Sequence, residues 1–131
     1  MGILFPMITL IRGGAYTDKR GSLTFCNDFD MQEVRRFYTI ANSKESPCRG
    51  WIGHRRETKW FFPLKGSTEI IIESMNGKVR RSVFLSSTEP AVLKVEPGNW
   101  FCINQDGNAE VMVFSNCCIG EFKDDDFRRP L

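Results

Sequence analysis

The sequence predicts an all-β fold, a single-domain antiparallel jelly-roll barrel. Helical periodicity is nearly absent, short apolar runs recur along the chain, and turn-forming residues separate them. A chain of 131 residues, 41% of them hydrophobic, is long enough to build one core. Small antiparallel sandwiches with many short strands are commonly jelly rolls, and their interior can hold a ligand between the two sheets.

Apolar or alternating runs are expected to form the strands. In chain order they are residues 8–11, 22–26, 34–40, 49–55, 59–64, 67–74, 78–85, 91–95, 99–104 and 109–115. We see no internal repeat and no domain boundary, so residues 1–131 are expected to form one domain. Its core would span about 8–116, and residues 117–131 would be a charged tail, either a short helix or a loose end.

Turn chemistry lies between these runs. The turn dipeptides are Gly13-Gly14, Asn76-Gly77, Pro97-Gly98 and Asp106-Gly107. Asn76-Gly77 is a strong signal for a type I′ hairpin, and Asp106-Gly107 predicts a second hairpin. One helical turn is expected over residues 30–34, where Asp30 and Glu33 have the spacing of a capping box.

Composition excludes several classes of partner. The net charge of +2 comes from 18 basic and 16 acidic residues, a balance that does not suggest nucleic-acid binding. No apolar run reaches the length of a membrane span, and the first residues lack the pattern of a signal peptide. The five cysteines include no CxxC pair, so we expect reduced thiols in a cytoplasmic protein.

A metal site is not expected. The metal centres of jelly-roll proteins need about three histidines and a carboxylate, and this chain has a single histidine, His54. A site of mixed cysteine and histidine ligands is also disfavoured, because no two cysteines have ligand spacing. We therefore expect neither a metal nor another cofactor.

His54 is the main candidate for chemistry. A lone histidine is more often structural than catalytic, but Gly50 and Gly53 allow a close approach by backbone or ligand, and nearby arginines suit an anion. Strand alternation places Ile52 and His54 on one face. Lys59, a candidate for stabilising an oxyanion, shares that face only if the chain bends at residues 55–58. Both a role in a ligand site and a purely structural role remain open for His54 at this point.

Five motifs in order carry a resemblance to a known superfamily. They are "DKRGSL" (18–23), "RRFYTI" (35–40), "RGWIGH" (49–54), "EPGNW" (96–100) and "VMVFS" (111–115). Over most of its length the chain resembles the nucleotide-sugar cupins. These are the dTDP-4-dehydrorhamnose 3,5-epimerases and the dTDP-4-dehydro-6-deoxyhexose 3,4-ketoisomerases, with the WxcM-like sugar epimerase subgroup closest. The resemblance implies a cupin jelly roll and a cofactor-independent isomerase or epimerase that abstracts a proton next to a 4-keto group in deoxysugar and surface-polysaccharide synthesis.

The resemblance also assigns catalytic roles and shows departures. The family's base position, two residues after the glycine of the Arg-Gly pair, holds Ile52, whereas His54 matches a second histidine of the ketoisomerases. A position that is often histidine in the ketoisomerases is Phe101. We expect His54 to act as the base, Lys59 to stabilise the enolate and Tyr38 to act as an acid.

Substrate binding is assigned to Arg49, Arg36, Trp51 and Arg20, with an arginine holding the diphosphate and Trp51 either stacking on the base or belonging to the core. The expected ligand is a nucleotide-linked sugar, dTDP-linked as in the families it resembles. Because Ile52 replaces a base, a catalytically degenerate cupin that binds the sugar nucleotide without turnover is the alternative. We also expect a homodimer, since sheet edges need covering and the segment Ile3 to Ile11 suits a partner sheet.

Overall fold

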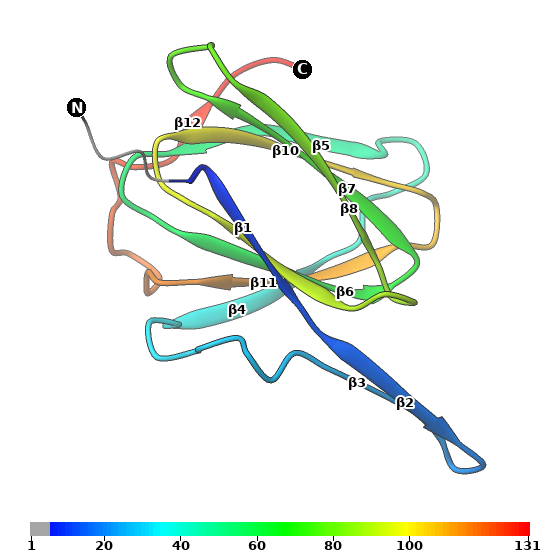
Figure 1. Cartoon of the computed structure of the whole chain (residues 1–131). Helices are drawn as coiled ribbons and strands as arrows, with labels where there is room; N and C mark the ends of the chain where they lie inside the picture. The colour runs from blue at the N-terminus through cyan, green and yellow to red at the C-terminus, as the bar shows by residue number, and fades with distance from the viewer. Residues whose placement is uncertain (1–5) are drawn as a thin grey trace.

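Two antiparallel sheets pack face to face in the computed structural model, which describes residues 6–131 (Figure 1). The first sheet has the order β1 (Ile8–Arg12), β9 (Ala91–Val95), β6 (Lys59–Lys65), β11 (Glu110–Ser115) and β4 (Arg36–Ile40). The second has the order β12 (Phe127–Arg128), β5 (Cys48–His54), β10 (Asn99–Gln105), β7 (Ser67–Ser74) and β8 (Arg80–Ser86). The all-β jelly-roll prediction is confirmed.

A separate hairpin of β2 (Gly14–Asp18) and β3 (Gly21–Phe25) projects beyond the two sheets (Figure 1). The sequence predicted only its second strand, because β2 begins at a glycine pair that was interpreted as a turn. Tyr16 and Leu23 are paired across the hairpin and are 59% and 62% exposed. The hairpin is therefore an arm with apolar side chains that the two sheets of its own chain leave uncovered.

The core lies between the sheets and follows strand alternation. Phe61 of β6, Ile70 and Ile72 of β7, and Val111 and Val113 of β11 are fully buried. On the same strands the intervening residues point away from the core. This alternation determines which residues of β4, β5 and β6 face the interior near the functional site.

No helix forms among residues 6–131, so this part of the chain has no helix that could cross a membrane. The single turn expected over residues 30–34 is present as an isolated hydrogen-bonded turn, and it is not helical. The Asp30 carboxylate accepts from the backbone N–H of Gln32, and Val34 N–H bonds to the Met31 carbonyl, which closes a single turn. The capping-box spacing is present, but no amphipathic run follows it to propagate a helix.

The two hairpin signals have different outcomes. Asn76-Gly77 joins β7 to β8, which pair up to Glu73 and Arg80, so that hairpin is confirmed with a loop longer than the two-residue type I′ turn. The Asp106-Gly107 hairpin is wrong. Strand β10 pairs with β5 and β7, and β11 pairs with β4 and β6, so this turn carries the chain from one sheet to the other.

A β-bulge in β5 lies upstream of the functional residues. Between Phe101 and Ile103 of β10 the register shifts, and β5 accommodates one extra residue near Gly50. Gly50 has φ of +153°, and a Cβ added there would lie 2.8 Å from the backbone Cα of Cys102. Both facts require glycine at this position.

We predict that Gly50→Ala destabilises the fold by about 2 kcal/mol or more, because it adds a backbone clash to an unfavourable φ. Gly21→Ala is the matched control, since Gly21 also has a positive φ, of +130°, but nothing within 4 Å of its added Cβ. Urea unfolding of the two variants measures the difference. Equal losses of stability in the two variants would show that crowding against Cys102 is not what requires glycine in this bulge.

Candidate active site

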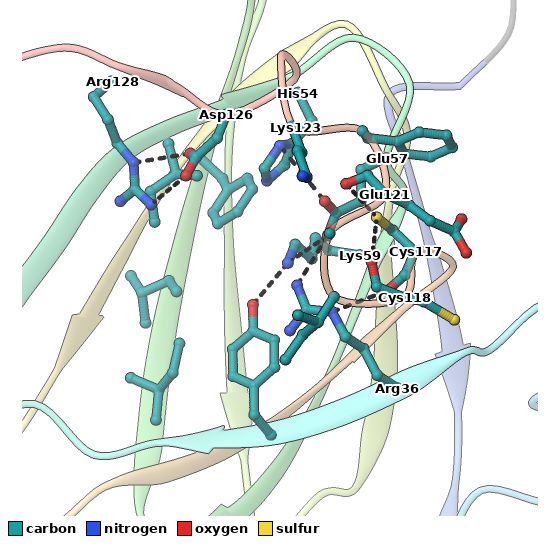
Figure 2. Close-up of a pocket in the computed structure, with 18 residues that line it drawn as sticks. Arg36, His54, Glu57, Lys59, Cys117, Cys118, Glu121, Lys123, Asp126 and Arg128 are labelled. Atoms are coloured by element: carbon teal, nitrogen blue, oxygen red, sulfur yellow. Dashed lines mark hydrogen bonds and ion pairs between the residues drawn. The ribbon is translucent and has the colours of Figure 1, made fainter.

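A cavity of about 310 Å³ opens between the sheets where β5 ends and β6 begins (Figure 2). Strand β4 contributes Arg36 and Tyr38, β5 contributes His54, and β6 contributes Lys59. The remaining wall comes from residues 117–128, which run across the opening. The predicted bend at residues 55–58 exists: it carries the chain from one sheet to the other, so His54 and Lys59 come from facing sheets.

His54 is buried and held in one tautomer. Its Nδ1 lies 2.6 Å from the backbone carbonyl of Asp125. A carbonyl can only accept, so in the neutral ring Nδ1 carries the proton and Nε2 carries the lone pair. Nε2 has no hydrogen-bond partner among residues 6–131 although it is buried. The ring is therefore oriented with an unpaired basic nitrogen next to the cavity.

Lys59 and Tyr38 form a second polar group in the same cavity. Lys59 Nζ donates to the Tyr38 hydroxyl oxygen at 2.7 Å and lies 2.6 Å from Oε2 of Glu57. Because the ammonium only donates, the Tyr38 O–H proton is free to point to another acceptor. Lys59 is 4% exposed, so its charge is compensated mainly by Glu57.

Glu57 is ionised despite its burial. Burial alone would raise its pKa, but hydrogen bonds from Lys59 and Ser115 and the nearby positive charges outweigh that effect and hold the pKa below its ordinary value. The Arg36 guanidinium lies 3.8 Å from the same carboxylate and donates through Nε to the Cys117 carbonyl. Figure 2 shows Arg36, Glu57 and Lys59 gathered on this side of the cavity.

Asp125 holds the turn that connects the two catalytic candidates. Its buried carboxylate accepts backbone N–H groups from Arg55, Arg56 and Glu57 at 2.6, 2.8 and 2.9 Å. Strand β12 pairs with β5 directly afterwards, at Phe127 and Gly53. The region expected to be a short helix or a loose end thus consists of turns and a two-residue strand, and it closes the cavity.

The opposite wall of the cavity is apolar. Ile40, Ile52, Phe101 and Ile103 line it, from β4, β5 and β10. Ile52, which stands at the base position of the resembling families, belongs to this wall. The cavity therefore presents one surface of acid, base and cationic groups and one surface suited to an apolar group.

The FdtA family model (WxcM-like, C-terminal) matches residues 6–130, nearly the whole chain. The chain belongs to the WxcM-like family. The resemblance seen in the sequence is thereby confirmed at the level of the family. A comparison with curated proteins gave no match.

Solved structures share the fold of this WxcM-like chain. A 3,4-ketoisomerase from Helicobacter canadensis is 22% identical, with a TM-score of 0.74 over 93% of this chain and 90% of that one. The 3,4-ketoisomerase QdtA from Thermoanaerobacterium thermosaccharolyticum, a histidine-to-asparagine variant in complex with TDP-4-keto-6-deoxyglucose, is 20% identical, with a TM-score of 0.76 over 96% and 90%. The rmlC epimerase of Mycobacterium tuberculosis is 15% identical, with a TM-score of 0.77 over 97% and 70%.

Four of the seven predicted site residues of this WxcM-like protein line the cavity, and three do not. Arg49, the second residue of β5, is exposed and donates to the side-chain oxygen of Asn42. Trp51 is buried on the outer face of its sheet, with Arg129 4.5 Å and Arg80 5.3 Å from its ring, so it is not available for stacking in this cavity. Strand alternation separates Trp51 from the face of His54. Arg49 precedes the bulge, pairs with Ile103 and lies outside the cavity.

Arg20 lies in the projecting hairpin and pairs with Asp18 at the surface, outside the cavity of its own chain.

Gly50 and Gly53, which were expected to allow a close approach by backbone or ligand, lie against neighbouring protein atoms and not against the cavity. A Cβ at Gly53 would meet the Trp100 ring at 2.7 Å, and one at Gly50 would meet Cys102. Both glycines allow close approach of the neighbouring strand.

Sequence reasoning missed Glu57, Ser115 and Asp125. Glu57 carried a usable signal, because it is the one acid in the cationic segment 48–62, and a buried lysine needs such a partner. Asp125 carried none, since it stands in a run of three aspartates whose other members are exposed.

We predict that Asp125→Asn lowers the free energy of unfolding by about 2 kcal/mol at pH 7, because three N–H groups lose a charged acceptor. Burial favours a raised pKa for Asp125, but the three backbone hydrogen bonds and the His54 charge outweigh it, and the pKa falls below its ordinary value. The contribution is therefore complete above about pH 4 and is lost as pH falls through the lower folded value.

Urea unfolding of wild type and Asp125→Asn between pH 7 and pH 3 tests this. The gap between their free energies of unfolding should close in acid. Asp124→Asn is the control, since its side chain is 86% exposed and forms only a surface pair with Arg56. A gap that persists unchanged at pH 3 would contradict the assignment.

Proposed function

We propose that this protein isomerises a nucleotide-linked 4-keto-6-deoxy sugar by abstracting a proton from the carbon next to the ketone. The observation that carries the proposal is the oriented His54 ring, whose unpartnered Nε2 borders a cavity shared with Lys59 and Tyr38. This donor set matches the chemistry, which needs a base, a stabiliser for an oxyanion and an acid.

The proton transfers follow from the roles of these side chains. His54 Nε2 accepts the proton from carbon, and the electrons of the broken C–H bond form the enolate. Lys59 and the Tyr38 O–H stabilise the enolate oxygen. Return of a proton to the same carbon from the other face gives an epimer. Return of a proton to the former carbonyl carbon gives a ketoisomer, provided that the proton of the neighbouring hydroxyl moves through Tyr38 to the former carbonyl oxygen. The donors act without a metal or an organic cofactor.

The cavity suits a sugar ring rather than a whole sugar nucleotide. Its volume of about 310 Å³ is at the small end of the range for ligand pockets. The apolar wall accommodates the C6 methyl of a deoxysugar, and the diphosphate and thymidine lie outside the cavity, with Arg36 near its opening. A thymidine nucleotide is proposed because the solved structures with this fold include a complex with TDP-4-keto-6-deoxyglucose.

The protein is proposed to act in the cytoplasm as a homodimer. The five cysteines form no disulfide, which suits a reducing compartment. The hairpin of β2 and β3 exposes Tyr16 and Leu23, and a partner copy is the occupant proposed for it. Arg20 would then contribute to ligand binding from the partner side. Of the segment Ile3 to Ile11, residues 8–11 pair with β9 of the same chain, and residues 3–5 lie outside the described residues.

We predict that His54→Asn slows proton exchange by about 10²-fold or more, the usual scale for loss of a general base. The measurement incubates the protein with a 4-keto-6-deoxy sugar nucleotide in deuterated water and follows label at C3 and C5. Binding affinity and melting temperature should change little, because the cavity keeps its shape. Lys59→Met should abolish exchange.

A binding protein without turnover gives a different pattern. It would bind the nucleotide sugar but show no label in the wild type, and Lys59→Met would only weaken binding. If His54 is purely structural, His54→Asn lowers the melting temperature and leaves exchange per folded molecule unchanged.

We predict a homodimer in solution that survives dilution, measured by light scattering. Tyr16→Ser with Leu23→Ser removes the apolar side chains of the arm and should raise the fraction of monomer, because exposed hydrophobic surface on the hairpin would drive association. Phe84→Ser is a control for general loss of surface apolarity, as Phe84 is 70% exposed on β8. A wild-type protein that stays monomeric at high concentration would refute the dimer.

A further inference from the structure

Glu57 lies between the two catalytic candidates and contacts both. It is 7% exposed, in the turn that links β5 to β6. Its Oε2 receives Lys59 Nζ at 2.6 Å and the Ser115 hydroxyl at 2.7 Å, and its Oε1 lies 3.9 Å from His54 Nδ1 (Figure 2). One oxygen thus holds the lysine, and the other faces the imidazole.

The position of Lys59 depends on this carboxylate. A buried ammonium needs a counter-charge and acceptors for its protons. Glu57 supplies the charge, and Tyr38 supplies an acceptor in the cavity at 2.7 Å. Because the contact with Glu57 fixes one N–H of the ammonium, a second N–H points to the Tyr38 hydroxyl and the cavity.

The charge of His54 depends on the same group. When Nε2 accepts a proton the ring becomes an imidazolium. The Asp125 carbonyl that holds Nδ1 offers a dipole, and the negative charge of the Asp125 carboxylate is shared with three backbone N–H groups. Glu57 offers a full negative charge 3.9 Å from Nδ1. Opposite charges at this distance favour the protonated ring.

We propose that Glu57 is a positioning residue that serves both halves of the site, directing Lys59 toward Tyr38 and compensating the charge that His54 gains when it takes a proton from substrate. Its catalytic meaning rests on the proposed function, but its effect on His54 is a property of the free protein. Other charged groups that line the cavity are Arg36 and Lys59 from the strands, and Glu121, Lys123, Asp126 and Arg128 from the segment that closes it.

The test uses the single histidine of the chain. Protein labelled with ¹⁵N-histidine gives NMR signals from one imidazole, His54, and its titration can be followed without assignment of other residues. In Glu57→Gln, His54 should become protonated at a pH lower by about one unit or more than in wild type. Glu121→Gln is the matched control, since Glu121 lines the same cavity but its ion pair is with Arg35, and it should change the titration little.

Kinetics supply the second measurement. Glu57→Gln should lower kcat by about 10²-fold, with KM within a few-fold, because the two carboxylate oxygens lie against Lys59, Ser115 and His54. Glu57→Asp keeps the charge and should restore part of kcat. If Glu57→Gln does not fold, titration of His54 in Lys59→Met and in Lys59→Met with Glu57→Gln gives the same comparison without an unpaired buried lysine.

The outcomes separate the two proposals. An unchanged His54 titration in a folded Glu57→Gln protein, or an equal shift in Glu121→Gln, overturns the positioning role. Full kcat in Glu57→Gln overturns it as well. A shifted His54 titration in Glu57→Gln, together with a wild-type protein that catalyses no exchange, supports the electrostatic link and overturns the proposed reaction.

Discussion

Three backbone N–H groups converge on the buried carboxylate of Asp125, and the functional cavity depends on this interaction. The groups belong to residues 55–57, the turn that takes the chain from the second sheet to the first. His54 ends one strand and Lys59 begins the next, so the conformation of this turn sets where both side chains stand. The carbonyl of the same aspartate fixes the histidine tautomer. A single residue therefore connects the geometry of the turn to the protonation of the ring.

The cavity concentrates charge in a place where charge is costly. Glu57 and Lys59 are both nearly inaccessible to solvent, and their mutual contact together with Ser115 and Tyr38 satisfies them. Among residues 6–131, His54 Nε2 is the buried side-chain nitrogen or oxygen that lacks a partner. Native proteins seldom leave such an atom unpaired, which is why the proposed function assigns the proton transfer to it.

The sequence predicted the fold well because strand signals are local. Alternation and turn residues place most strands, and alternation within β5 correctly groups Ile52 with His54. The Asp106-Gly107 prediction failed because a turn dipeptide reports that the chain reverses, not which strand it pairs with afterwards. The same limit applies to the site. Arg49 and Trp51 were chosen for their chemistry, although alternation sets Trp51 on the other face and Arg49 lies before the bulge, outside the cavity.

Long-range contacts were beyond sequence reasoning. Ser115 is 58 residues from Glu57, and the carboxylate of Asp125 is 68 residues from the N–H of Glu57 that it accepts. Nothing in the local pattern around these residues distinguishes them from surface polar groups. Glu57 was visible as a lone acid among cations, but its contact with His54 appears only once the turn is folded.

The distance along the chain between His54 and its acceptor also separates the pairing of the sheets from the setting of the ring. The two are 71 residues apart. Every strand of the two sheets other than β12 has a partner strand outside residues 116–131. Local opening of that segment would therefore leave the core between the sheets in place and remove the carbonyl that selects the histidine tautomer. The imidazole can thus lose its competent tautomer without unfolding of the barrel.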